Sequence, residues 1–230
     1  MAREALRETE PKEEMEVNSE EYKRMSLREF DRAAEKFDDD DPSVYNMCRK
    51  DYPDILEEIQ KEDFQDMLDA GCGTGAMIHM LYKDVPDKRY TGLDLSEKMI
   101  AAAVRKHMEG VSFVVGDCEA IPFEADSFDV ITCSMSFHHY PNPEKFFQNA
   151  GRVLRGNGRL ILRDMASSSK GLMWFFNHVE IPLANKLAKK GDVHVYSRDE
   201  IQRLCDASGL KLERYEVRKG FRLHCVCRKA

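Results

Sequence analysis

The stretch MLDAGCGTGA places three glycines, Gly71, Gly73 and Gly75, within five positions of a chain that has only 13 glycines in 230 residues. A short apolar run precedes these glycines and a helical pattern follows them, which indicates a loop between a strand and a helix. Glycines in such a loop allow a tight turn and let the backbone approach a ligand closely. The residues therefore predict a ligand at this loop.

Asp94 follows the glycines by about twenty residues, which is the spacing of an acid that binds ribose hydroxyls. With Ala76 in the third position, the pattern Gly71-x-Gly73-x-x-Ala76 also satisfies the fingerprint of dinucleotide-binding enzymes. On pattern alone, a nicotinamide-dependent oxidoreductase and other enzymes with a nucleotide-binding loop remain open alternatives.

Two adjacent histidines, His138 and His139, follow a strand-like run at 128–134. Imidazole has an ordinary pKa that suits a general base near neutral pH. Such a pair can instead orient a loop or pack beside a ligand. Asp164 ends another strand-like run at 158–164 and is a weaker candidate for the base.

Strand-like runs alternate with helical patterns from Phe64 onward, which predicts an α/β fold with a parallel sheet covered by helices on both faces. In such a sheet the loops at the carboxyl edge bind ligands. The turn Lys219-Gly220 is too short for a crossover, so the last two strands must be antiparallel to each other. The expected strands are 64–69, 89–94, 111–116, 128–134, 158–164, 210–217 and 221–228, and the expected helices among them are 75–83, 96–108, 143–155 and 198–208.

The N-terminal residues 1–18 are acidic and unpatterned, so we expect a flexible tail there. Helical stretches at 19–37 and 43–61 follow, the first with an apolar stripe of Phe30, Ala33, Ala34 and Phe37. One domain is expected over 19–230, composed of an N-terminal helical cap (19–61), a ligand-binding core (64–165), a lid-like insertion (166–197), and a closing helix and hairpin (198–230).

The formal net charge of −7 is concentrated near the N-terminus, where residues 1–41 hold 15 acidic and 8 basic side chains. The remaining body is neutral, which argues against a nucleic-acid-binding surface. No run has the roughly eighteen apolar residues of a membrane span, and the first residues lack the pattern of a secretory signal. We therefore expect a cytoplasmic protein with reduced thiols. No metal site is predicted, because Cys225 and Cys227, the only close pair of cysteines, alternate like one face of a strand.

Asp69 precedes the first glycine by two residues and completes the sequence DAGCGTG, which resembles motif I of the class I S-adenosylmethionine-dependent methyltransferases. The resemblance covers about residues 64–165 and is closest in kind to the small-molecule branch, near the enzymes of ubiquinone and menaquinone biosynthesis and methyltransferase type 11. It implies a Rossmann-like, doubly wound sheet of seven strands, mostly parallel with an antiparallel C-terminal strand, and extra N-terminal helices that help to close the active site. The later stretches that carry it are TGLDLS, GDCEAIPF, FDVITCS and FHHY.

The resemblance implies that the chain binds S-adenosylmethionine and releases S-adenosylhomocysteine. Asp69 would support the loop, Asp94 would accept the ribose hydroxyl protons, and Asp117 would face the adenine amino group. The simpler alternatives are that Asp69 and Asp94 are turn acids, that Asp117 caps a strand end, and that Met99 belongs to the core. The expected cofactor-binding residues are Asp69, Ala70, Gly71, Cys72, Gly73, Gly75, Asp94, Leu95, Met99, Gly116, Asp117, Cys118, Ser134 and His139.

Methyl transfer is an in-line displacement that the protein assists mainly by alignment and exclusion of water. We expect a small apolar or aromatic acceptor; the acceptor atom, the use of His138 or His139 as base, and the choice between monomer and homodimer remain open. The Asn/Asp-Pro-Pro motif of amine methylation is absent after 128–134, which disfavours nucleic-acid bases. A catalytically silent cofactor-binding protein on the same fold is the alternative function.

The insertion 170–190 is apolar on nearly all sides, so it needs cover on two sides. One side can pack on the body, and the other could close over an acceptor or could meet the N-terminal helices or a subunit partner. A membrane-surface role is disfavoured, because the stretch lacks an extended basic face. The expected acceptor-binding residues are Phe137, Tyr140, Asp164, Trp174 and Phe175.

Overall fold

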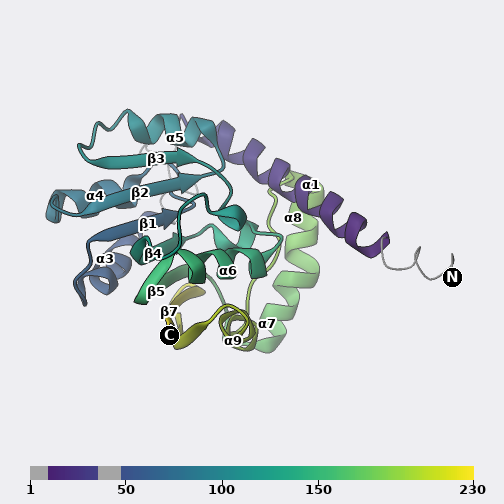
Figure 1. Ribbon diagram of the computed structural model, residues 1–230. Helices are drawn as coiled ribbons and strands as arrows, with labels where there is room; N and C mark the ends of the chain where they lie inside the picture. Colours follow the sequence, from purple (N-terminus) through teal and green to yellow (C-terminus); the bar gives the residue numbers. More distant parts are fainter. Residues whose placement is uncertain (1–9, 36–47) are drawn as a thin grey trace, which may run out of the picture.

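Seven strands form a single sheet in the order β3-β2-β1-β4-β5-β7-β6 (Figure 1). The computed structural model describes residues 10–35 and 48–230. Each strand overlaps its predicted position, although β5 begins four residues earlier than expected, because helix α6 ends at Val153. The strands are β1 (Asp66–Ala70), β2 (Arg89–Asp94), β3 (Val111–Val115), β4 (Phe128–Ser134), β5 (Leu154–Met165), β6 (Leu210–Arg218) and β7 (Arg222–Lys229).

The first five strands pair in parallel, and β7 pairs antiparallel with both β5 and β6. Parallel neighbours need long crossovers, which the helices supply, whereas residues 219–221 alone connect β6 to β7. This short connection forces the antiparallel pairing that the Lys219-Gly220 turn predicts. The mostly parallel seven-stranded α/β fold is therefore confirmed.

Helices cover both faces of the sheet, because successive strand residues point to opposite faces. Met67 packs with residues of α3 (Tyr52–Gln60), α4 (Ala76–Asp84) and α5 (Glu97–Val104). Its neighbour Leu68 packs on the other face with α6 (Pro143–Val153) and α9 (Arg198–Asp206). Two apolar cores thus hold the sheet between them and fix where its strands end.

Helix α1 (Glu10–Ala33) lies beside α8 (Ile181–Ala188) at one end of the molecule (Figure 1). The helix therefore begins nine residues before its expected start at residue 19, within the segment that was expected to be a tail. The predicted continuation of this helix to Phe37, and the predicted start of the next helix at 43, lie outside the described residues.

The insertion folds into α7 (Lys170–Phe175), a π-helical turn (Phe176–Glu180) and α8. Met173 and Ile181 point inward and pack with Val195 in a small apolar cluster. No helix within 10–35 or 48–230 has both the length and the apolar character that a bilayer crossing requires.

Glu58 connects α3 to the two C-terminal strands. Its Oε2 atom lies 2.6 Å from Nη1 of Arg214, 3.2 Å from Nε2 of His224 and 2.7 Å from Nζ of Lys61. Burial alone would raise the pKa of this carboxyl, but the hydrogen bonds from its three partners outweigh burial and lower the pKa to about 2. Glu58 is buried, so its negative charge is tolerated only while these partners bind it. The contact therefore holds α3 against the sheet as long as the ion pairs remain intact.

We expect Glu58→Gln to lower the free energy of unfolding by about 3 kcal/mol at neutral pH, because the buried carboxylate is lost and Arg214, Lys61 and His224 lose their shared partner. The folded-state pKa of Glu58 lies below its ordinary value of 4.5, so the stabilisation is present above that value and is lost as the pH falls toward about 2. Urea denaturation of both proteins at several pH values measures this loss. A difference that stays constant down to about pH 3 would contradict the assignment.

Candidate active site

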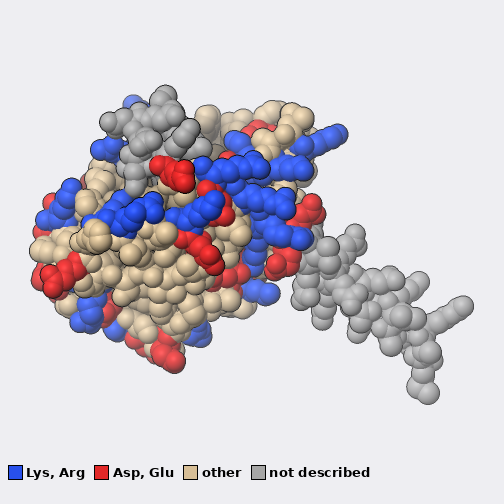
Figure 2. Space-filling view, turned by 90° about the horizontal axis from the view of Figure 1, so that it is seen from above, with Lys and Arg blue, Asp and Glu red and all other residues tan. Residues whose placement is uncertain are grey.

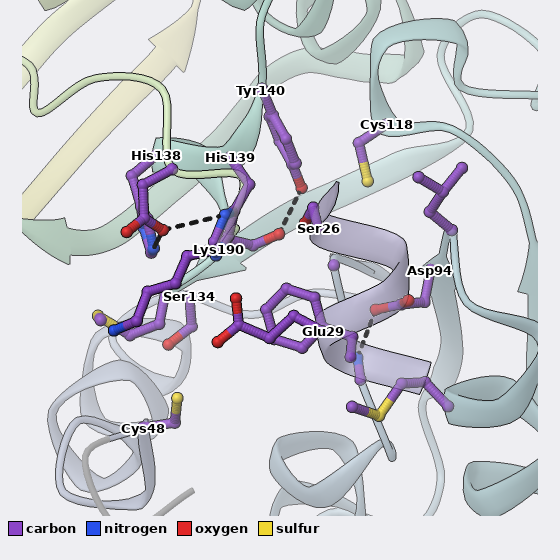
Figure 3. Close-up of a pocket in the computed structure, with 18 of the residues that line it drawn as sticks. Ser26, Glu29, Cys48, Asp94, Cys118, Ser134, His138, His139, Tyr140 and Lys190 are labelled. Carbon is purple, nitrogen blue, oxygen red and sulfur yellow. Dashed lines mark hydrogen bonds and ion pairs between the residues drawn. The ribbon is translucent and has the colours of Figure 1, made fainter. Parts of the chain in front are cut away.

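A cavity of about 410 Å³ lies at the carboxyl ends of β1, β2 and β4 (Figure 3). Helix α1, the segment 134–141 and the residues after α8 complete its wall. The structure brings most of the predicted cofactor residues together here, from elements far apart in the sequence. Those that line the cavity are Gly71, Cys72, Gly73, Asp94, Leu95, Met99, Asp117, Cys118, Ser134 and His139.

The glycine loop depends on backbone conformations and close approaches that side chains would prevent. Gly71 and Gly75 have φ angles of +76° and +69°. A Cβ atom on Gly71 would lie 2.1 Å from Oγ of Ser136, and one on Gly75 would lie 2.7 Å from the ring of Phe113. Gly71 lines the cavity, whereas Gly75 packs beneath it against the sheet.

Asp94 presents its carboxylate at the end of β2, where two backbone N–H groups hold it. Gly73 donates to Oδ2 at 2.8 Å and Ser96 donates to Oδ1 at 2.9 Å. Burial raises the pKa of Asp94, and these two hydrogen bonds oppose the rise. Each carboxylate oxygen keeps a free lone pair, so Asp94 can still accept a pair of ribose hydroxyls.

Leu95 and Met99 continue the cavity wall beyond Asp94. Leu95 is 37% exposed although it is a large apolar side chain in a concave site, whereas Met99 is buried. An aromatic ring bound here would cover the exposed part of Leu95. The arrangement of a fixed acid beside an apolar shelf therefore fits the adenosine part of the predicted cofactor.

Asp69, Ala70 and Gly116 lie outside the cavity wall. Asp69 is buried and accepts a hydrogen bond from Oγ1 of Thr132 at 2.8 Å; burial raises its pKa to about 7. Ala70 is fully buried in the core, and a Cβ atom on Gly116 would lie 2.8 Å from Leu93. These three residues lie behind the cavity wall and support it, and their contact with the cofactor stays a prediction.

Asp117 lines the cavity and also caps the short helix Cys118–Ala120. The capping role and a position at the cavity are therefore compatible. Its Oδ1 accepts from the backbone N–H of Glu119, and its Oδ2 accepts from Nζ of Lys23 at 2.7 Å. Lys23 belongs to α1 and also pairs with Glu119. Helix α1 is thereby tied to the acid that is expected to face adenine.

Two polar atoms at the cavity have no hydrogen-bond partner among the described residues: Oγ of Ser134 and Oε2 of Glu29. Figure 3 shows the Glu29 carboxyl group on the side of the cavity where Lys190 and Ser134 lie. Burial, together with the charge of Asp192, raises the pKa of Glu29. Buried polar atoms are costly without partners, so their positions favour a polar ligand group in this space.

His138 and Asp164 form a buried dyad at the cavity. Nδ1 of His138 donates to Oδ1 of Asp164 at 2.7 Å, and the backbone N–H of His138 donates to Oδ2 at 3.1 Å. Burial alone would lower the pKa of His138, but the charges of Asp164, Asp192 and Glu29 outweigh it and raise the pKa. With Nδ1 bound, Nε2 is the nitrogen left to exchange a proton with a ligand. Asp164 therefore lies behind His138 rather than against an acceptor.

His139 has a different environment from its neighbour. Burial and the charge of His138 move its pKa well below the ordinary value, so its ring is neutral. Nδ1 lies 3.3 Å from the carbonyl of Gly191, and the ring meets Phe30 edge-on at 5.1 Å. His139 thus fits a packing role at the cavity better than that of a base.

Spacing alone would allow a metal ion among His138, His139 and Asp192, whose ligand atoms lie within 4.8 Å of one another. A carbonyl can only accept, so the contact with Gly191 requires a proton on Nδ1 of His139. In that tautomer the remaining lone pair of the His139 ring is on Nε2, and Nδ1 also lies 3.3 Å from Oδ1 of Asp192. Asp192 thus joins the two histidines in one polar cluster, since its Oδ1 lies 3.7 Å from Nε2 of His138.

The predicted acceptor residues separate into two groups. Tyr140 lines the cavity and shares a hydrogen bond of 2.9 Å with Ser136; burial raises its pKa well above the ordinary value. Phe137 is fully buried and packs against Phe146 and Tyr196, so its prediction as an acceptor residue is wrong.

Trp174 and Phe175 also lie away from the cavity wall, at 59% and 45% exposure, so the lid over the acceptor stays a prediction that the described geometry does not favour. The reason is the helix face: Met173 packs inward, and the residues that reach the cavity are Phe176 and Glu180 of the π-helical turn. Helical periodicity marked the segment as apolar without showing which side faces the body.

Sequence reasoning missed most of the wall that α1 and the loop after α8 supply. Phe30 and Ala33 line the cavity, as the apolar stripe of α1 indicates. The missed cavity residues have no motif, because they come from elements that pack across the strand ends: Lys23, Ser26, Glu29, Cys48, Tyr52, Lys190 and Asp192.

Comparison with known proteins gives one coherent result. Residues 68–162 match the family model described as a methyltransferase domain. A demethylmenaquinone methyltransferase of Thermotoga maritima is 31% identical over 180 residues, which cover 76% of this chain and 78% of that protein. A phthiotriol/phenolphthiotriol dimycocerosates methyltransferase of Mycobacterium ulcerans is 37% identical over 109 residues, but the aligned part spans only 40% of that relative and 47% of this chain.

Solved structures agree on the fold. The methyltransferase in complex with the Haloferax volcanii Trm112 activator superposes with a TM-score of 0.71 at 19% identity, covering 87% of this chain and 97% of that chain. An S-adenosylmethionine-dependent methyltransferase from Aquifex aeolicus gives 0.64 at 20% identity, covering 86% and 98%.

We expect Asp94→Asn to weaken S-adenosylhomocysteine binding about ten- to a hundredfold, since hydrogen bonds to a charged group contribute about 1.5–3 kcal/mol. Isothermal titration calorimetry measures the two dissociation constants. Asp84→Asn, at the exposed end of α4, is the matched control and should bind like the wild type. Equal affinities of Asp94→Asn and the wild type would mean that another group binds the ribose.

Proposed function

Because the chain belongs to the class I S-adenosylmethionine-dependent methyltransferases, we propose that it methylates a small apolar or aromatic acceptor held beside His138. The observation that carries this proposal is that one cavity is lined both by the acids suited to the cofactor, Asp94 and Asp117, and by His138, which Asp164 holds from behind. The nicotinamide alternative has no support from the family.

S-adenosylmethionine, when bound, supplies a methyl group already activated on a sulfonium. Asp94 would hold the ribose, the shelf of Leu95 and Met99 would cover the adenine, and the glycine loop would receive the amino-acid end. The protein's contribution is then to fix the acceptor in line and to exclude water.

The character of the rest of the cavity supports an apolar acceptor. Away from the adenosine shelf, one part of the wall is apolar and is formed by Phe30, Ala33, Cys48, Tyr52, Met135, Met165 and Phe176, while polar groups such as Glu29, His138 and Lys190 line another part. Two relatives are named for demethylmenaquinone and for phthiotriol/phenolphthiotriol dimycocerosates, which agrees with an apolar acceptor. Cavities for such molecules use few polar groups, which orient the reacting atom.

His138 would take the proton that an acceptor hydroxyl or acidic C–H loses as its new bond to the methyl carbon forms. The proton goes to Nε2, while Asp164 holds Nδ1 and balances the charge of the imidazolium. Asp164 is accordingly a positioning residue, and His139 packs beside the dyad without exchanging protons.

Turnover with defined acceptors tests the proposed substrate class. Demethylmenaquinol with a short prenyl chain and a simple phenol serve as apolar probes, with glycine as the polar probe, and S-adenosylhomocysteine release is measured. We expect turnover with the apolar probes. Phe176→Ala should raise their KM about tenfold or more through lost packing, whereas Trp174→Ala, which lies outside the cavity, should not.

Turnover of glycine without turnover of either apolar probe would overturn the acceptor class. Cofactor binding without turnover of any probe would instead favour a silent binding protein.

We expect His138→Gln to lower kcat about a hundredfold or more while the cofactor dissociation constant stays unchanged, because a general base contributes at this scale. The base must be neutral, and the pKa of His138 is raised above its ordinary 6.5, so wild-type turnover should rise with pH beyond that value. Asp164→Asn removes a charge that raises this pKa and should shift the rise to lower pH. If His138→Gln kept the wild-type pH profile, the proton would go to another group.

A further inference from the structure

An apolar stripe remains exposed on the outer side of the insertion. Phe175, Val179, Leu183 and Leu187 recur every four residues, so they follow one face of the helical segment. Their exposed fractions are 45%, 38%, 52% and 75%, and Trp174 beside them is 59% exposed. We refer to these five residues as the α7–α8 face. A contiguous stripe of this kind differs from scattered exposed apolar residues and marks an interaction site.

Cations flank the α7–α8 face. Arg24 and Arg28 of α1, Lys186 of α8 and Lys189 directly after α8 line one groove, with Glu21 as the one acid among its lining residues that the structure describes. Within 10–35 and 48–230, neither Arg28 nor the two lysines form an ion pair. Figure 2 shows Lys and Arg side chains gathered on the face of the molecule that includes α1.

The α7–α8 face adjoins the cavity. Phe176 and Glu180, next to Phe175 and Val179 in the chain, line the cavity from the inner side of the same segment. Phe176 also meets the ring of Phe221 at 5.9 Å, and Phe221 is itself 51% exposed at the tip of the β6–β7 hairpin. Apolar surface thus continues from the cavity to the outside of the molecule.

We propose that the α7–α8 face docks on the surface of an anionic lipid bilayer. Leucine, phenylalanine and tryptophan suit the boundary between headgroups and acyl chains, and a cationic rim attracts anionic headgroups. A second copy of the chain fits less well, because a two-fold contact through this face would bring the cationic groove against its own copy. The insertion alone lacks an extended basic face. In the folded protein, Arg24 and Arg28 of α1 lie beside its lysines and supply the missing cations.

Vesicle sedimentation tests the docking without any methyl acceptor. The full chain is mixed with sucrose-loaded vesicles of phosphatidylcholine, and with vesicles in which about one third is phosphatidylglycerol. We expect binding to the anionic vesicles only, weakened by salt. Leu183→Gln/Leu187→Gln and Lys186→Glu/Lys189→Glu should each reduce the partition coefficient at least about tenfold.

Matched controls keep this result specific. Val104→Gln replaces an equally exposed apolar residue on α5, and Lys211→Glu reverses an exposed charge at the start of β6. Both controls should bind vesicles like the wild type. All substituted positions are exposed, and thermal unfolding of each variant confirms that its fold is intact.

Two results would overturn the proposal. The first is a wild type that stays unbound by anionic vesicles at low salt. The second is a dimer in solution that Leu183→Gln/Leu187→Gln converts to a monomer without any vesicle binding by the wild type, which would assign the face to a second copy. Neither result depends on whether the proposed acceptor class is correct.

Discussion

The order of the strands determines where chemistry can occur in this molecule. Along the sheet, β1 lies between β2 and β4, so the connections leave β1 and β4 toward opposite faces and leave a crevice between their carboxyl ends. Asp94, the glycine loop and Ser134 all come from strands that end at this crevice. These groups lie close together because parallel pairing aligns the carboxyl ends of neighbouring strands, even when the strands are far apart in the sequence.

The two apolar cores fix the strand end that carries the acids of the site. Met67 and Leu68 anchor the same strand to helices on opposite faces. In this setting burial raises the pKa values of Asp69 and Asp94, and hydrogen bonds from Thr132, Gly73 and Ser96 oppose that rise. The acids of the site are thus held by the scaffold before any ligand arrives, which reduces the ordering cost of binding.

Sequence and structure agree best where local rules decide the outcome. Apolar runs predicted the strands, and the glycine pattern predicted the loop and the position of Asp94. Phe137 was misassigned because a residue beside two cavity residues can still point into the core. The outward positions of Trp174 and Phe175 were not anticipated, because composition does not fix the rotation of a helix. Lys23 was missed because its partner Asp117 lies 94 positions away, and no local pattern encodes such a pair.

The π-helical turn at Phe176–Glu180 sets the rotation of the whole insertion. A turn of this kind accommodates one residue more than an α-helical turn, and one residue corresponds to about 100° around the axis. The part of the segment before the turn is therefore rotated against the part after it by that amount. If the same residues formed ordinary α-helical turns instead, Met173 and Trp174 would rotate together about the axis by that angle relative to α8. The conformation of this one turn thus determines which side chains of the insertion are buried and which are exposed to solvent.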